Sequence, residues 1–179
     1  MHQVINAIIY ANSGKDAIEH ATEIFNQLTV NEEPYDYYNL FNSSYATSRW
    51  GQRATCSNVA NGRGLGIVNK AWKLTEKEIK YNLDIVRKHL ELYDNQDFID
   101  GSYELPEGAE WSAHMVLHFM YSASKYTGST YFLYDNDGEA IRNRHHLDNV
   151  LDKWSCLYKD KPNPYQDKKI WVIPADVHY

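Results

Sequence analysis

The spacing of apolar residues near the N-terminus predicts a strand followed by a helix. Residues 4–10, VINAIIY, form an apolar run of strand length. After a polar turn, apolar residues recur three or four positions apart as far as Leu28, which is the period of one helix face. Ser13 stands where an N-cap is expected, and Asp16 follows three residues later, close to the capping-box pattern. We therefore predict a strand, a tight turn and an amphipathic helix.

The clearest helical pattern lies in the middle of the chain. Residues 75–78, TEKE, match a full capping box, and apolar residues follow at helical spacing up to Tyr93. A third helix is expected from about Glu110 to Tyr126, with a polar stripe so narrow that most of this helix should be buried. Residues 29–45 mix helix-breaking and aromatic positions, and the pattern assigns them to no element.

The last third of the chain predicts a hairpin, a fourth helix and a final strand. Residues 130–134 and 139–142 flank the sequence DNDG, whose Asp-Gly pair supplies the positive φ angles of a hairpin turn. Residues 147–158 have apolar positions at helical spacing, and residues 169–173 form a strand-length segment. Because helices and strands are interleaved without a strict βαβ repeat, the sequence predicts an α+β fold with a small, mainly antiparallel sheet packed with about four helices.

Length and composition indicate a soluble globular protein. With 179 residues, 23% of them charged, residues 1–179 should form a single compact domain around one core. Two cysteines, Cys56 and Cys156, are too few for a disulfide framework and lack C-x-x-C spacing, which favours a reducing compartment. No stretch approaches the roughly 20 apolar residues of a membrane span, and the N-terminus lacks signal-peptide features. We expect a cytoplasmic protein without membrane contacts.

Charge is distributed unevenly along the chain. The overall formal charge of −6 argues weakly against general affinity for nucleic acid. Between Asp36 and Glu76, however, there is no acidic residue, and we call residues 37–75 the acid-free segment. All of its charged side chains are basic: Arg49, Arg53, Arg63, Lys70 and Lys73. The net charge therefore hides a locally cationic region.

The acid-free segment holds the candidate ligand-binding residues. Arginine offers a planar fork that matches phosphate or carboxylate, glycines let backbone amides turn toward an anion, and tryptophan stacks on a base. The candidates are Arg49, Trp50, Arg53, Gly62, Arg63 and Gly64. They suit an anionic ligand, a nucleic acid or an acidic protein surface. The pattern is neither a dinucleotide fingerprint nor a Walker A loop, and the alternative is a surface loop whose arginines pair with acids elsewhere.

Two histidines suggest a metal site. His114 and His118 lie four residues apart on the third predicted helix, a spacing that zinc uses. The possible third ligands are His145, His146, Asp176 and His178. Such a site would bind a divalent metal. Apolar residues between the two histidines, Val116 and Leu117 among them, leave no glutamate base for the usual metalloprotease. Alternatively, the pair makes ordinary hydrogen bonds on the polar edge of the helix.

Three functions remain open from the sequence. The first is a small noncatalytic accessory or regulatory protein that binds an anion, nucleic acid or acidic partner through the acid-free segment. A phage or mobile-element origin would fit its size and composition. The second is a metal-assisted hydrolase or nucleotide-processing enzyme that uses the histidines. The third is a self-associating structural protein with an aromatic interface at residues 35–45. The sequence leaves the oligomeric state open.

Overall fold

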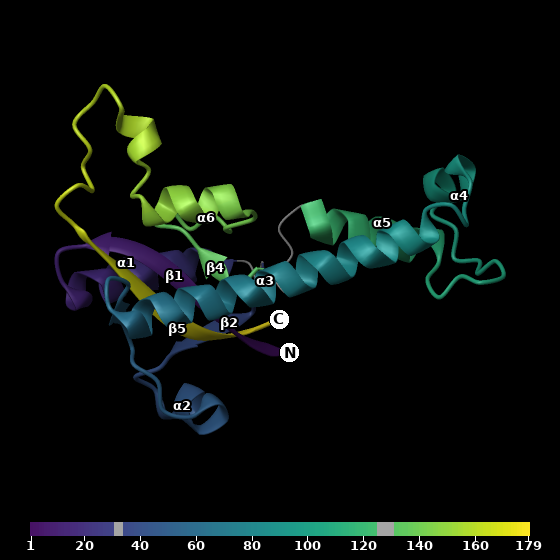
Figure 1. The fold of residues 1–179 in the computed structure, drawn as a ribbon. Coiled ribbons are helices and arrows are strands. Elements are labelled where there is room, and N and C mark those ends of the chain that lie inside the picture. The colour runs from purple at the N-terminus through teal and green to yellow at the C-terminus, as the bar shows by residue number, and fades with distance from the viewer. Residues whose placement is uncertain (31–33, 125–130) are drawn as a thin grey trace. The chain divides into compact units, whose positions relative to one another are not determined.

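The computed structural model describes residues 1–30, 34–124 and 131–179 (Figure 1). Contacts divide the chain into two compact units, with unit 1 formed by residues 1–75 and 131–179 and unit 2 by residues 76–130. The strands are β1 (His2–Ala11), β2 (Tyr37–Leu40), β3 (Ser57–Asn58), β4 (Leu133–Tyr134) and β5 (Lys169–His178). The helices are α1 (Gly14–Gln27), α2 (Ser44–Trp50), α3 (Gly62–His89), α4 (Asn95–Asp100), α5 (Ala113–Ser124) and α6 (Arg144–Leu151), with a 3₁₀ helix η2 (Ser155–Tyr158).

A mixed, mainly antiparallel sheet forms the centre of unit 1. The first and last strands, β1 and β5, pair along their whole length, from His2 opposite His178 to Ala11 opposite Lys169. Strands β2 and β3 both pair antiparallel with β5, and β4 pairs parallel with β1. The strand order is β2-β5-β1-β4, so the two chain ends lie side by side (Figure 1). The predicted α+β class with a small, mainly antiparallel sheet is confirmed.

Helices cover both faces of this sheet. Ile8 and its partner Val172 share a core cluster with Val68 of α3 and Leu147 of α6. Side chains alternate along a strand, so the odd-numbered residues of β1 face the other way. On that side Trp171 contacts the start of α1. Strand β1 is therefore buried on both faces, which explains why its sequence reads as a continuous apolar run.

The first predicted unit is confirmed. Strand β1 contains the apolar run at residues 4–10, and α1 follows with the expected cap. The Ser13 hydroxyl accepts a hydrogen bond from the Asp16 backbone N–H at 3.2 Å. Helix α1 buries Ala17, Ala21, Ile24 and Phe25, which lie on the face that the spacing predicted. Residues 31–33 of the segment left unassigned lie outside the described residues.

The predicted start of the second helix is wrong. Helix α3 begins at Gly62, thirteen residues before the TEKE sequence, and runs to His89. Asn61 caps it, because its side-chain oxygen accepts from the backbone N–H of Gly64 at 2.7 Å. Thr75 is fully buried inside the helix, where its hydroxyl accepts from the backbone N–H of Phe132 at 3.3 Å. The acid-free segment is therefore not one surface loop, since its second half is helical.

The predicted hairpin is shorter than expected. Its turn is present, with Gly138 at φ 84°, but the strands on either side are joined antiparallel only by a bridge between Tyr134 and Ala140. Strand β4 pairs with β1 instead, because the buried Leu133 and Tyr134 complete the central sheet. Residue 130 lies outside the described residues.

The predicted fourth helix does not run unbroken from residue 147 to residue 158. Helix α6 ends at Leu151, and Lys153 and Trp154 then take left-handed conformations with φ of 52° and 54°. The 3₁₀ helix η2 follows. Apolar spacing continued through this break, so the sequence pattern did not reveal it.

Unit 2 has a small core of its own. Tyr93, Ala113 and Val116 form its buried centre, with Phe98 and Trp111 packed against them. The expectation that α5 is mostly buried is wrong, since Leu117, Met120 and Tyr121 are exposed. The helix is described up to Ser124, and its predicted end at Tyr126 lies outside the described residues. No helix among the described residues is long and apolar enough to cross a membrane.

Candidate anion-binding site

The cations of the acid-free segment have no acidic partners among the described residues. Ion pairs form elsewhere in the described chain, for example between Lys15 and Glu19 and between Arg144 and Asp148. None of these ion pairs involves a residue of the acid-free segment. Their charge is thus uncompensated at close range, which disagrees with the alternative of a loop whose arginines pair with acids elsewhere.

Two of these cations line one cavity of unit 1. The cavity has a volume of about 260 Å³, and Arg53 and Lys70 border it together with the Trp50 ring. His2 of β1 is a further polar residue of the lining. The rest of the lining is Gln3, Val4, Asn6, Ile67, Ala71, Leu74 and Phe132. A cavity with two cationic groups and an aromatic wall is suited to an anion.

Regular secondary structure positions most of this lining. Ile67, Lys70, Ala71 and Leu74 are three or four residues apart and so occupy one face of α3. His2, Val4 and Asn6 alternate along β1 and share the sheet face that packs against α3. The side chains around the cavity are therefore held by a strand and a helix and not by a loop alone.

A tight bend brings Arg53 to the cavity. Helix α2 ends at Trp50, and Gly51 has φ 77°, a conformation that favours glycine. Beyond the bend the Arg53 guanidinium carbon lies 5.3 Å from the Phe41 ring centre and 5.9 Å from the Trp50 ring centre. These cation–π contacts fix the guanidinium without neutralising it, so its charge stays available to a ligand.

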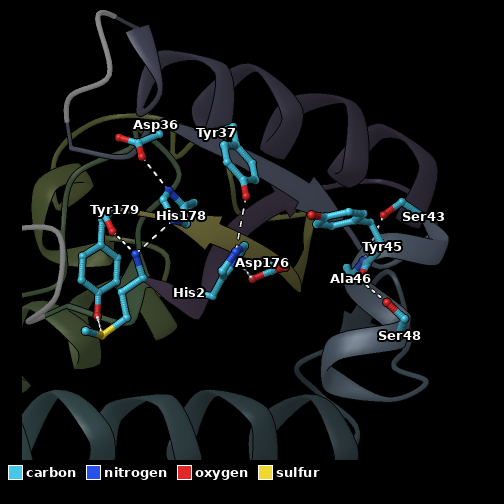
Figure 2. A network of polar contacts seen from close by, with 11 residues as sticks. His2, Asp36, Tyr37, Ser43, Tyr45, Ala46, Ser48, Asp176, His178 and Tyr179 are labelled. Atoms are coloured by element: carbon cyan, nitrogen blue, oxygen red, sulfur yellow. Dashed lines mark hydrogen bonds and ion pairs between the residues drawn. The ribbon is translucent and has the colours of Figure 1, made fainter.

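His2 belongs to a polar network at the end of the sheet. Figure 2 shows its ring between two partners on neighbouring strands: Nδ1 lies 3.0 Å from Asp176 Oδ1, and Nε2 lies 3.3 Å from the Tyr37 hydroxyl. An ionised carboxylate only accepts, so Nδ1–H donates to Asp176. His178 continues the network through Asp36 at 2.6 Å and stacks on the Tyr37 ring at 5.1 Å.

Two buried polar atoms, one on a residue that lines the cavity and one on the partner of His2, have no hydrogen-bond partner among the described residues. One is the indole nitrogen Nε1 of Trp50, and the other is Asp176 Oδ2. Asp176 has an exposed fraction of 0%, and a buried polar atom without a partner costs free energy, on the order of 1–3 kcal/mol. Asp176 Oδ2 therefore lowers the stability of the fold where it stands.

The structure separates the predicted ligand-binding residues. Trp50 and Arg53 line the cavity, whereas Arg49 packs over the Tyr45 ring at 5.6 Å and Arg63 is exposed in the first turn of α3. Gly62 and Gly64 are helical. Of the two, Gly64 makes a close contact: a Cβ atom there would come within 2.1 Å of the Asn58 carbonyl oxygen. This glycine allows close packing between α3 and β3, a role different from the predicted one of letting backbone amides turn toward an anion.

The two candidate metal ligands lie in unit 2. His114 is exposed on α5 and stacks on the Tyr103 ring at 4.6 Å, and His118 is exposed one turn later. Of the suggested third ligands in unit 1, His146 pairs with Asp135, Asp176 with His2 and His178 with Asp36. Within the part of the chain that the structure describes, no three His, Cys, Asp or Glu side chains gather as a metal site would require.

Sequence reasoning did not assign His2 or Lys70 to the site. Lys70 was visible as a cation of the acid-free segment, but only a helix starting at Gly62 places it on one face with Ile67 and Leu74. His2 precedes the apolar run of β1, and its partner Asp176 stands at the other end of the chain. No local pattern connects two such distant residues.

The fold and the cavity define an α+β protein with a cationic pocket between a central strand and a long helix. A family model described as "Domain of unknown function (DUF7995)" matches residues 1–179. Because the match spans the whole chain, the chain belongs to this family. No curated protein and no solved structure matches it significantly.

Proposed function

We propose that this protein is a small noncatalytic binding protein that holds an anionic group in the cavity of Trp50, Arg53 and Lys70. The observation that carries the proposal is the convergence of two cations, without acidic partners among the described residues, on one cavity with an aromatic wall. An anion would supply the missing counter-charge.

The size of the cavity limits which ligands can fit. A volume of about 260 Å³ lies just below the usual range for small-molecule sites, so the cavity suits a phosphate or carboxylate group with one attached ring. The Arg53 fork offers two parallel hydrogen bonds, Lys70 adds a point charge, and the Trp50 ring offers a stacking surface. A mononucleotide, or one nucleotide of a single strand, has this combination of phosphate and flat ring.

The partners of His2 favour binding over catalysis. A general acid or base needs a ring nitrogen that reaches the substrate. Both nitrogens of His2 already have protein partners, Asp176 and the Tyr37 hydroxyl. The metal-assisted alternative gains no support from the described residues, because no metal-binding group of side chains occurs there. Of the aromatic segment suggested for self-association, Tyr35 and Phe41 are buried in the fold.

Calorimetric titration of the full chain tests the proposal. The probes are inorganic phosphate, adenosine monophosphate and a short single-stranded oligonucleotide, each at two salt concentrations. Arg53→Gln and Lys70→Gln should each weaken binding about five- to tenfold and reduce its salt dependence, since each removes one charged contact. Tighter binding of adenosine monophosphate than of inorganic phosphate would identify the base ring as part of the ligand.

Matched controls lie in the same segment. Arg63→Gln and Lys73→Gln remove exposed cations that do not line the cavity, so they change the net charge equally but should leave affinity nearly unchanged. If all four variants weaken binding alike, the anion is attracted by the general charge of the segment and the cavity is not the site. If none of the probes binds the parent protein at millimolar concentration, the proposed function is wrong.

A further inference from the structure

A second cavity of unit 1 combines aromatic rings with carboxylates. It has a volume of about 440 Å³ and lies around the turn at residues 135–139, the start of α6 and η2. Its rings are Trp154, Tyr158 and Tyr165, and its carboxylates are Asp135, Asp137 and Glu139. Its chemistry is thus the opposite of that of the cationic cavity, and the two sites are independent of each other.

One of the three carboxylates has a structural role. Asp135 is 3% exposed, and its Oδ1 accepts from the backbone N–H groups of Asp137 at 3.0 Å and Glu139 at 2.9 Å. Its Oδ2 lies 2.9 Å from His146 Nε2. These contacts fix the turn and hold His146 at the cavity wall. Because both of its oxygens already have hydrogen-bond partners within the chain, Asp135 is not left free to contact a ligand.

The other two carboxylates remain available. Asp137 and Glu139 are exposed and form no ion pair within the described residues. The opposing charge in the lining is Arg142, which is likewise exposed and without an ion pair there. Burial raises the pKa of the Tyr165 phenol, and the neighbouring Asp137 raises it further. Tyr165 therefore stays neutral at physiological pH in a field that favours positive charge.

Unusual backbone geometry places the tryptophan at this cavity. Lys153 and Trp154 both have positive φ, which non-glycine residues rarely adopt. The backbone N–H of Trp154 donates to the Asn149 carbonyl at 2.7 Å. The indole then packs against the His146 ring at 5.1 Å. Strained residues of this kind cluster at ligand sites, and here the strain holds an aromatic ring at the cavity wall.

The tyrosines extend the aromatic wall. Tyr158 meets Tyr165 edge to face, with ring centres 6.0 Å apart. The Lys168 ammonium of the chain itself lies 5.6 Å from the centre of the Tyr165 ring. Tyr165 thus already makes a cation–π contact, whereas among the described residues no cation of the chain lies over the Trp154 or Tyr158 ring.

We infer that this cavity binds an organic ammonium group, preferably a methylated one. Ring faces attract cations, and methylated ammonium loses less hydration than a bare amine when rings enclose it. Asp137 and Glu139 supply the charge that distinguishes a cation from a neutral ligand of the same shape. A metal ion does not suit the site, because aromatic carbons are poor ligands and no three-residue metal cluster occurs among the described residues. The cation belongs either to a free amine or to a methylated lysine of a peptide.

Paired probes of equal shape and different charge test the inference on the full chain. Choline carries a quaternary ammonium, and 3,3-dimethylbutanol replaces its nitrogen by carbon. Titration followed by nuclear magnetic resonance should show choline binding at least about tenfold more tightly, because the cation–π and carboxylate contributions vanish for the neutral probe. A short peptide with one trimethyllysine separates the two sources: tighter binding of the peptide than of choline indicates a peptide partner, and the reverse order a free amine.

Two charge variants at this cavity should change the affinity for choline in opposite directions. Asp137→Asn should weaken choline binding about threefold or more, whereas Arg142→Gln should strengthen it, since both residues border the cavity with opposite charges. Asp167→Asn, an exposed carboxylate outside the lining, should leave the affinity unchanged. Tyr158→Leu keeps an apolar side chain but removes the ring, and it should weaken choline while leaving the neutral probe unaffected.

Three results would overturn the inference. One is equal binding of choline and its neutral analogue, which would make the cavity merely apolar. Another is a response of the same sign to Asp137→Asn and Arg142→Gln. The third is that choline, the peptide and tetramethylammonium all fail to bind at ten-millimolar concentration. The nuclear magnetic resonance spectrum of the same sample must then show that the protein is folded.

Discussion

Replacing Gly64 by alanine should destabilise the protein, although alanine is the better helix former. At this position a Cβ atom would lie 2.1 Å from the Asn58 carbonyl oxygen and 2.9 Å from the Val59 Cα. Both neighbours are backbone atoms, so no side-chain rotation relieves the contact. The start of α3 and the segment at β3 have to move apart until the first distance exceeds 3.0 Å.

The size of the effect follows from two opposing contributions. Overpacking against backbone costs about 3 kcal/mol, at the upper end of the usual range. The better helix propensity of alanine and the lower entropy of the unfolded chain together stabilise the folded state by about 1 kcal/mol. The free energy of unfolding should therefore fall by about 2 kcal/mol. With a urea dependence of about 2 kcal/mol per molar, the unfolding midpoint should drop by about 1 M.

Gly66→Ala is the matched control, because it lies in the same helix and a Cβ atom there has no neighbour within 4 Å. This variant should raise the free energy of unfolding by about 0.5–1 kcal/mol. Urea unfolding followed by tryptophan fluorescence is a suitable assay, because it reports mainly on unit 1, where α3 packs against β3. Trp111 lies in unit 2, and the other tryptophans lie in unit 1. Equal midpoints for the two variants would refute the close packing of α3 against β3.

Three further outcomes are expected. Burial, followed by the charge of Asp135, raises the pKa of Tyr10, so the unfolded chain releases this proton near pH 10 while the folded protein retains it. Stability should thus be lost as pH rises above 10, by about 1.4 kcal/mol per pH unit, and Tyr10→Phe should flatten the loss in urea titrations. Ser13→Ala should lower the free energy of unfolding by about 1 kcal/mol and Ser13→Asp by much less, because aspartate also caps α1. Thr75→Val should cost about 1–2 kcal/mol and Thr75→Ser less, with a similar cost in both disproving the hydrogen bond to Phe132.

Local patterns predicted the elements that tertiary contacts reinforce. Strand β1 and helix α1 were found from the sequence because the apolar run, the Ser13 cap and the helical spacing all indicate the same structure. The start of α3 was missed for a physical reason. Three glycines between residues 62 and 66 weaken the helical signal, yet one of them is required by the contact with Asn58. Helix propensity reflects only that glycine destabilises a helix. It contains no information on the tertiary packing that the glycine permits.

The candidate site was predictable only in part. Trp50 and Arg53 were named from the cationic character of the acid-free segment, and both line the cavity. Lys70 and His2 could be joined to them only by knowing that α3 starts early and that β1 lies beside it. Which of five cations share a pocket is decided by contacts distant in sequence, and a single sequence does not contain that information.

The pairing of β1 with β5 has a consequence for how the chain acquires its structure. Strand β1 is buried along most of its length and leaves the ribosome well before its longest partner, residues 169–178. Until that partner emerges, an apolar segment stays without its main hydrogen-bonding neighbour, and closing so long a loop slows folding. Interrupted synthesis would therefore release chains with an exposed, aggregation-prone strand, the kind of segment that chaperones bind.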